Sequence, residues 1–238
     1  MLSLEERMKS YYENRNQTYL IRRMPVLMRL DGRAFHTYTK NFEKPFDERL
    51  NASLVGSAVD LLKEIQGAKC AYIQSDETSI LITDYDKLET EAWFDYNVQK
   101  MVSVASSIFS VNFCLFGGIS QTIILPTFDC RAWNIPREDV ENYFLWRQQD
   151  WNRNSLTMVA RTYYSHKELD NKKTPEMHEM LYSKGQNWAN YPDRWKNGVF
   201  IYKEDGEWID TRKTKCPRFN ELKAREIIRG MVNCDENN

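Results

Sequence analysis

The chain has 238 residues, 42% of them hydrophobic and 28% charged, so it can bury a sizeable core and is too apolar to be disordered. Its formal net charge is −1, so any contact with RNA or DNA must come from a local basic patch. Five widely spaced cysteines without a CxxC pair favour reduced thiols in a cytoplasmic protein over a disulfide framework or a zinc site. The apolar runs fall short of a membrane span, so we expect no membrane partner.

The N-terminal part should form a helix and then a strand. Ser3 and Glu6 have the spacing of a capping box, which predicts a helix over residues 3–16. An apolar strand follows Pro25 and ends at Asp31. Because successive side chains of a strand point to opposite faces, it should present two sets of residues: Leu27, Arg29 and Asp31 on one face, and Val26, Met28 and Leu30 on the other.

Asp31 and Gly32 end this strand in a way that suits either a turn or a ligand. Glycine lets the backbone approach a ligand closely, and a carboxylate beside it can hold a metal-bound phosphate. Asp-Gly is also common in turns that bind no ligand. The polar segment 33–45 that follows has no clear periodicity, and its basic side chains could face an anion or solvent.

The next elements predict an α+β domain with an antiparallel sheet. Asp47 can cap a helix of apolar period, which Gly67 ends. Two strands at 70–73 and 79–83 flank a tight polar connection, and a long helix should run from 88 to 110. The order strand, helix, strand, strand, helix is that of a ferredoxin-like palm, in which the first strand lies beside the hairpin.

The connection between the two strands contains Asp76 and Glu77. In such a palm the end of the first strand and the hairpin turn can be neighbours, so Asp31 and Asp76 should converge. Two carboxylates beside accessible backbone suit Mg²⁺, which prefers one or two carboxylates together with waters and substrate phosphates. A pair of such ions about 4 Å apart would clamp the attacking and leaving oxygens of a phosphoryl or nucleotidyl transfer. The alternative is that the acidic pair only decorates a solvated turn.

The second half of the chain is less regular. Further elements are predicted as strands at 121–124 and 128–135, a helix at 136–163, a hairpin within 198–211 and a last helix at 220–231. We therefore expect a palm-like catalytic domain over residues 1–135 and a helical, hairpin-containing C-terminal region over residues 136–238, packed on the palm as part of one compact unit. The densest basic cluster lies between Arg212 and Arg218.

Four motifs together are more specific than any one of them. They are R-L-D-G-R-A-F-H at 29–36, Lys44-Pro45, Q-S-D-E at 74–77 and W-R-Q-Q-D at 146–150. In combination they resemble the tRNA-His guanylyltransferase family, and most of all its branch of guanylyltransferase-like proteins that repair tRNA 5′ ends. The likeness is good over residues 5–165 and looser beyond them.

The resemblance implies a polymerase-like palm with a C-terminal extension, working in reverse. Nucleotides would be added to the 5′ end of tRNA in the 3′-to-5′ direction, with two Mg²⁺ ions. ATP or GTP would activate a 5′-monophosphate. The 3′-hydroxyl of the incoming nucleotide would then attack the RNA 5′ end and release pyrophosphate or AMP. The family also implies a homotetramer.

The resemblance further implies roles for individual residues. Asp31, Asp76 and the carbonyl of Gly32 would bind the metal ions, with Glu77 assisting the two catalytic aspartates. The nucleotide would contact Asp31, Gly32, Arg33, Ala34, Phe35, His36, Lys44, Ser75 and Asp76. The tRNA and its 5′-phosphate would contact Arg29, Lys100, Arg131, Arg147 and Asn154.

One departure from the family pattern bears on the reaction. Enzymes devoted to tRNA-His carry His-Ile-Asn-Asn where this chain has Asn152-Arg153-Asn154-Ser155, and only Asn154 matches. The departure favours template-dependent repair of truncated tRNA over non-templated addition of G to tRNA-His. Three other interpretations stay open: a palm-type nucleotide cyclase, a 5′-to-3′ polymerase and a catalytically inert tRNA-binding protein.

Overall fold

A six-stranded antiparallel sheet forms the centre of the computed structural model, which describes residues 2–118 and 125–233. The strands are β1 (Val26–Gly32), β2 (Ala68–Gln74), β3 (Glu77–Ile82), β4 (Phe128–Asn134), β5 (Val199–Glu204) and β6 (Glu207–Asp210). Their order across the sheet is β4-β1-β3-β2-β5-β6. The first strand therefore pairs with the β2–β3 hairpin, which confirms the predicted palm-like α+β fold.

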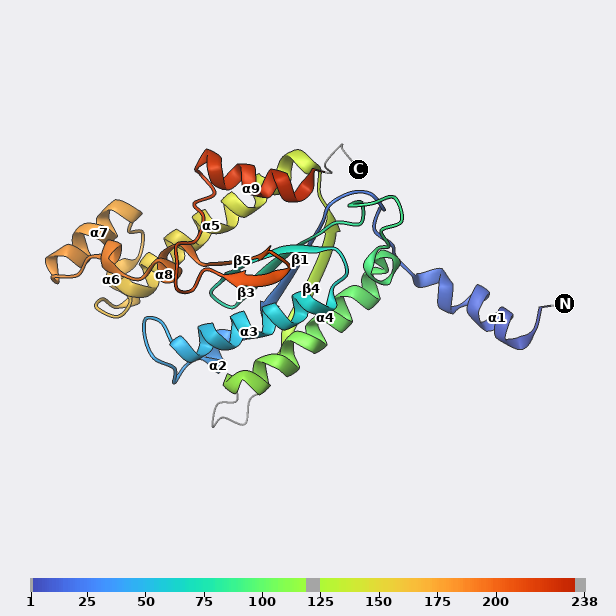
Figure 1. Cartoon of the computed structure of the whole chain (residues 1–238). Helices are drawn as coiled ribbons and strands as arrows, with labels where there is room; N and C mark the ends of the chain where they lie inside the picture. The colour runs from blue at the N-terminus through green and yellow to red at the C-terminus, as the bar shows by residue number, and fades with distance from the viewer. Residues whose placement is uncertain (1, 119–124, 234–238) are drawn as a thin grey trace.

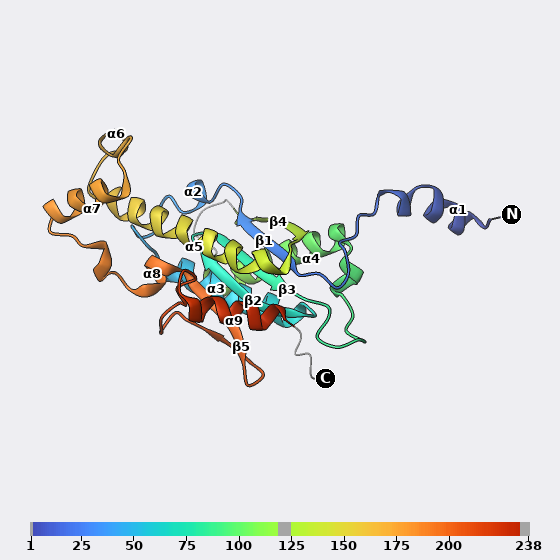
Figure 2. The ribbon, with the colours of Figure 1, turned by 90° about the horizontal axis from the view of Figure 1, so that it is seen from above.

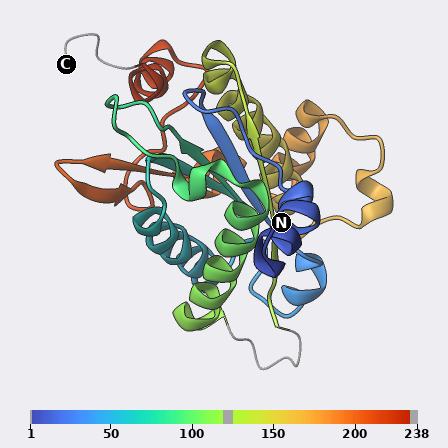
Figure 3. The ribbon, with the colours of Figure 1, turned by 90° about the vertical axis from the view of Figure 1, so that its right-hand side faces the viewer.

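Helices cover both faces of the sheet (Figure 1, Figure 3). α3 (Glu48–Glu64) and α4 (Val98–Phe113) lie on one face, and α5 (Arg137–Ala160) and α9 (Leu222–Val232) lie on the other. The shorter helices are α1 (Leu4–Tyr11), α2 (Phe35–Tyr38), α6 (His166–Leu169), α7 (Thr174–Ser183) and α8 (Asp193–Asn197). α1 stands away from the body at one end of the molecule, and α6 and α7 form the other end (Figure 2).

The two faces of β1 belong to two different cores, as the alternation of its residues predicts. Met28 and Leu30 are buried in the core under α3 and α4, whereas Leu27 is buried in the core under α5 and α9. Arg29 and Asp31 share the face of Leu27. β1 therefore presents its charged side chains on the side where α5 crosses the sheet.

Local sequence signals located the starts of α1 and α3. Ser3 and Glu6 form the predicted capping box, although α1 is shorter than expected because the 3₁₀ turn η1 (Glu13–Asn16) takes the place of its last part. Asp47 caps α3 as predicted. The strand expected at 121–124 lies outside the described residues.

The helix predicted to begin at Leu88 was wrong at its start. Leu88 is 83% exposed, and η2 (Trp93–Tyr96) is a 3₁₀ turn that contains left-handed backbone angles. α4 begins only at Val98, after its cap Asn97. The apolar pattern extended the prediction upstream because Trp93 is buried like a residue of the helix without belonging to it.

The stretch Val98–Gly117 is long and apolar enough to cross a membrane by length and composition, although we expected every apolar run to fall short of a span. In this fold one side of the stretch is core, since Met101, Ala105 and Phe109 are fully buried. Exposed serines such as Ser103 occupy the opposite side of α4. α4 thus buries one face in the core of the palm and leaves the other face exposed.

Candidate active site

Carboxylates gather where β1 ends. In the strand register, Asp31 lies opposite Glu77 of β3 and opposite Asp129 of β4. Directly opposite residues of antiparallel strands have their side chains on the same face, so these carboxylates form a row across the sheet. Asp76 precedes Glu77 in the turn between β2 and β3. The structure thus brings Asp31 and Asp76 to the same end of the sheet.

Burial and mutual repulsion act on both aspartates. Burial raises the pKa of Asp31, and the charges of Glu77 and Asp129 raise it further. Burial also raises the pKa of Asp76, to which the charges of Asp31 and Glu77 add. A divalent cation between the two carboxylates would relieve this repulsion.

This donor set fits Mg²⁺ better than a metal held by protein groups alone. Within residues 2–118 and 125–233, no group of three or more His, Cys, Asp or Glu side chains is arranged to hold a metal ion. Mg²⁺ needs fewer protein ligands, because it keeps several waters and binds the phosphates of its substrate. Asp31, Asp76 and the Gly32 carbonyl are therefore a sufficient protein contribution.

We expect Asp31→Asn and Asp76→Asn to stabilise the metal-free protein at pH 7. A raised pKa means that the folded state binds the proton more tightly than the unfolded state, so stability falls as the pH rises from about 4 through the raised pKa. Asparagine removes this loss, and each midpoint of thermal unfolding should rise by about 1–4 °C. Unfolding curves at several pH values would show the gain vanishing below about pH 4 and shrinking with Mg²⁺. Unchanged or lower midpoints at pH 7 would contradict the repulsion.

The chain after β1 anchors an aromatic ring in the core. α2 begins after Ala34, whose φ of 53° is left-handed. The ring of Phe35 packs against Phe113 and Phe128, with centroid distances of 5.7 and 4.9 Å. This packing fixes the backbone of residues 32–36 at the end of β1.

A cavity of about 460 Å³ opens between residues 32–36 and the β2–β3 turn, within the size range of small-molecule sites. The predicted nucleotide contacts that line it are Gly32, Ala34, Phe35, His36, Ser75 and Asp76. Those that lie outside its lining are Asp31, Arg33 and Lys44. Lys44 instead donates to the carbonyl of Thr39 at 2.9 Å.

The opposite wall of the cavity comes from residues that sequence reasoning missed. Phe46 and Trp195 stack with centroids 4.8 Å apart and ring planes 2° apart, and Trp151 of α5 packs against Phe46 at 6.2 Å. Arg161 and Arg194 line the same cavity. The sequence has no local signal for this wall, because these residues come from segments that are distant in sequence.

Two predicted phosphate contacts lie beside the row of carboxylates. Arg29 of β1 is opposite Arg131 of β4, two positions before Asp31. The side chain of Arg131 is 60% exposed, and that of Arg29 is 18% exposed. The Nε of Arg29 is buried and has no hydrogen-bond partner among the described residues. This arginine pair is a candidate site for an anionic RNA end.

Lys100 lies at the end of α4 that is away from Phe35. It is exposed on the first turn of α4, next to Asn97, which is bridged to Tyr19. α4 then runs along the sheet and reaches the Phe35 ring only with Phe113 near its end. A single chain therefore does not bring Lys100 to the carboxylates.

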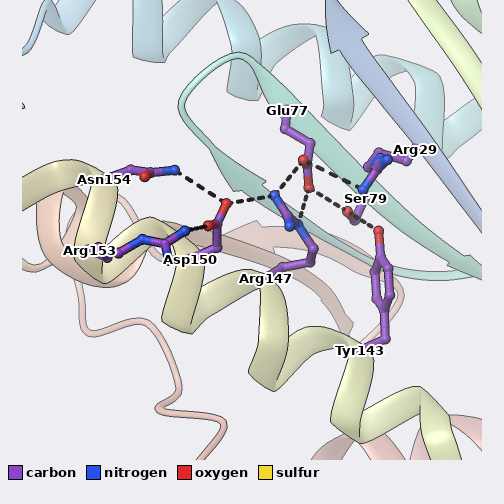
Figure 4. A network of polar contacts seen from close by, with 8 residues as sticks. All are labelled: Arg29, Glu77, Ser79, Tyr143, Arg147, Asp150, Arg153 and Asn154. Atoms are coloured by element: carbon purple, nitrogen blue, oxygen red, sulfur yellow. Dashed lines mark hydrogen bonds and ion pairs between the residues drawn. The ribbon is translucent and has the colours of Figure 1, made fainter.

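Glu77 and Arg147 form a buried ion pair between β3 and α5 (Figure 4). Arg147 donates from Nε and Nη2 to the two carboxylate oxygens of Glu77, at 2.8 and 2.7 Å. The Nη2 also donates to Asp150 at 3.1 Å. Arg147, expected to contact RNA, is thus occupied within the chain. Glu77, expected to assist catalysis, is bound to Arg147 and does not line the cavity.

Asp150 extends this network to the surface of α5 (Figure 4). Its carboxylate accepts hydrogen bonds from Arg153 at 2.5 Å and from Asn154 at 3.2 Å. Both of these side chains are exposed. Asn154, the predicted RNA contact, therefore lies at the surface end of the network.

An antiparallel palm with two adjacent carboxylates beside a nucleotide-sized cavity defines a palm-type nucleotidyltransferase. The sequence model of the tRNAHis guanylyltransferase family (Thg1) matches residues 5–136. The chain belongs to this family, which confirms the motif-based assignment and the enzyme class.

Solved structures and relatives agree with the assignment. A bacterial tRNA(His) guanylyltransferase-like protein in complex with ATP is 41% identical, with a TM-score of 0.90 over 98% of this chain and 100% of that chain. A complex of such a protein with GTP is 40% identical, with a TM-score of 0.83 over 97% of this chain and 99% of that chain. The tRNA(His) guanylyltransferase of Schizosaccharomyces pombe is 30% identical in an alignment that covers 77% of this chain and 76% of that protein.

Proposed function

We propose that this protein adds nucleotides to the 5′ end of tRNA in the 3′-to-5′ direction, with Mg²⁺, and that it thereby repairs truncated tRNA 5′ ends. The observation that carries the proposal is the meeting of Asp31 and Asp76 at one end of the sheet, beside the cavity lined by residues 32–36. The ATP and GTP complexes of similar proteins support both nucleotides as substrates of this chain.

The proposed reaction has two steps. A 5′-monophosphate oxygen of the RNA attacks the α-phosphorus of ATP or GTP, which forms a phosphoanhydride and releases pyrophosphate. The 3′-hydroxyl of the incoming nucleotide then attacks the 5′-phosphorus of the RNA, and the activating nucleoside monophosphate leaves. A 5′-triphosphate end needs no activation and loses pyrophosphate in the second step.

The chain contributes position and charge to both steps. The backbone of residues 32–36 and the turn residue Ser75 hold the triphosphate, and Arg29 with Arg131 holds the 5′-phosphate. Asp31, Asp76 and the Gly32 carbonyl would hold Mg²⁺, which when bound neutralises charge on the transferred phosphate. Placing charged groups where they face the reacting phosphorus is the main source of rate in such transfers.

We also propose that pairing with the 3′ side of the acceptor stem chooses the nucleotide. The motif of enzymes devoted to tRNA-His is absent from residues 152–155, where Arg153 binds Asp150 instead. A truncated tRNA leaves an unpaired nucleotide opposite its 5′ end, and this nucleotide can serve as the template.

We further propose a cytoplasmic homotetramer. The four described cysteines, at positions 70, 114, 130 and 216, are free thiols. α1 has no buried residue, and its Leu4, Met8 and Tyr11 are exposed. Apolar side chains on a helix that stands away from the body are suited to contact with another subunit.

Template dependence is tested with tRNAs that lack one 5′ nucleotide and end in a mono- or triphosphate. We expect the protein to add the NTP that pairs with the opposite base, and the preferred NTP to change when that base is changed. Only the monophosphate end should need ATP or GTP for activation. Sequencing the extended products gives the outcome.

Three results would contradict this function. Addition of G whatever the opposite base would indicate a tRNA-His enzyme. A cyclic nucleotide formed from GTP alone would indicate a cyclase. Tight, salt-dependent tRNA binding without any extension would indicate an inert binding protein.

A further inference from the structure

We propose that Glu77 is a positioning residue, and that Arg147 of α5 acts through it to hold the turn that carries Asp76. This inference rests on the proposed nucleotidyl transfer, since it presupposes that Asp76 belongs to the reacting centre. It differs from the role that the family resemblance implies for Glu77, which is assistance in catalysis.

Hydrogen bonds fix the side chain of Glu77 against α5. Arg147 meets Glu77 with two parallel hydrogen bonds, and the two side chains are only 8% and 9% exposed. A bidentate arginine–carboxylate pair fixes orientation as well as distance. Ser79 donates a further hydrogen bond to Glu77 at 3.3 Å, and Ser79 in turn bonds Tyr143 of α5 at 2.8 Å (Figure 4).

Glu77 directly follows the turn that contains Asp76. Gln74 pairs with Glu77 at the end of the hairpin, so only Ser75 and Asp76 form the turn. Ser75 has a φ of 49°, the left-handed conformation that two-residue hairpin turns need and that serine adopts rarely. Because Asp76 is covalently next to Glu77, fixing the side chain of Glu77 on α5 also limits where Asp76 can lie.

Electrostatics explains why a cation must be the partner. Glu77 lies opposite Asp31 in the strand register and directly follows Asp76, so its unpaired charge would repel both carboxylates. The other nearby cation, Arg29, is 3.9 Å from Glu77 and makes no hydrogen bond to it. Arg147 is itself held in place by Asp150 at 3.1 Å and by the ring of Trp146 at 4.5 Å.

A cycle of variants separates positioning from catalysis. For each variant, kcat and its Mg²⁺ dependence are measured with a 5′-truncated tRNA, and the thermal unfolding of the protein is measured separately. Arg147→Met should lower kcat by about 100-fold, since small misplacements of a reacting group have effects of this size. Glu77→Gln, which keeps an acceptor for Arg147, should lower kcat by less than about 10-fold. The double variant should regain only the part of the loss that the unpaired charge causes and should stay below Glu77→Gln, because neither hydrogen bond is left to hold the turn.

Matched variants complete the experiment. Arg229 donates to Glu141 at 2.7 Å, so Arg229→Met breaks an ion pair between α9 and α5 that lies away from the carboxylates. This pair is more exposed, since the side chain of Arg229 is 50% exposed and Glu141 keeps Arg225 as a second partner at 3.0 Å. Arg229→Met should lower the unfolding midpoint and leave kcat unchanged. If Arg147→Met fails to fold, Arg147→Lys keeps the charge without the planar fork, and its kcat should lie between those of the wild type and Glu77→Gln/Arg147→Met.

Two results would overturn the inference. Glu77→Gln as inactive as Asp76→Asn, with a higher Mg²⁺ requirement and no rescue in the double variant, would make Glu77 a metal ligand. If Arg147→Met lowers the unfolding midpoint but leaves kcat unchanged, the pair stabilises the fold without positioning Asp76. Failure of the proposed function is distinct, because then the wild type adds no nucleotide or Asp76→Asn adds it at the full rate.

Discussion

Asp76→Asn is expected to lower the rate of nucleotide addition by at least about 10³-fold, and Asp31→Asn by a similar factor. Each substitution removes a negative charge from the position where Mg²⁺ would bind, while the amide keeps the shape of the side chain. Activation of the 5′-monophosphate and addition to a 5′-triphosphate end should fall together, because both proposed steps would use the same ions. Single-turnover assays with 5′-labelled tRNA measure the two steps separately.

The folded state should survive these changes. Circular dichroism and thermal unfolding would report a protein at least as stable as the wild type, since both carboxylates repel their neighbours. Asp205→Asn is the matched control: it makes the same chemical change in the exposed turn between β5 and β6. Near-normal rates in either aspartate variant would refute the metal assignment.

Gly32→Ala is expected to lower activity by about 100-fold and stability by about 1–3 kcal/mol. A Cβ added at Gly32 would lie 2.5 Å from Cγ of Phe35, so the ring must leave its place. That ring anchors residues 32–36 through Phe113 and Phe128. Moving it therefore shifts both the cavity wall and the Gly32 carbonyl.

The measurement is a pair of assays on the same preparation, denaturant unfolding and tRNA extension. Gly230→Ala is the control, because a Cβ there has no neighbour within 4 Å and alanine favours the helical conformation of α9. It should be as active as the wild type and slightly more stable. Wild-type activity of Gly32→Ala would show that the backbone of residues 32–36 does not bind the triphosphate.

Elements defined by short-range signals were predictable from the sequence. The capping residues Ser3 and Asp47 act through backbone groups within a few positions, so their effect is visible locally. The alternation in β1 also identified its two faces correctly, because strand geometry is fixed by the backbone. The meeting of Asp31 and Asp76 followed from topology, which the order of elements was sufficient to indicate.

Contacts between distant segments were not predictable in the same way. Nothing near Glu77 signals that its partner is Arg147, since the pairing depends on how α5 crosses the sheet. Polar residues in succession on a helix are usually solvated. In α5, however, Arg147 and Gln148 are buried. The wall of the cavity formed by Phe46 and Trp195 likewise depends on the placement of α8 against the start of α3.

The pairing of β5 with β2 has a consequence for the synthesis of the chain on the ribosome. Tyr72 of β2 donates to the carbonyl of Asn197, 125 residues further along, and β5 begins at Val199. Until that part is translated, β2 keeps an open edge, which invites pairing with other nascent chains. Newly emerging molecules are thus most vulnerable to aggregation while α5 to α8 are being synthesised.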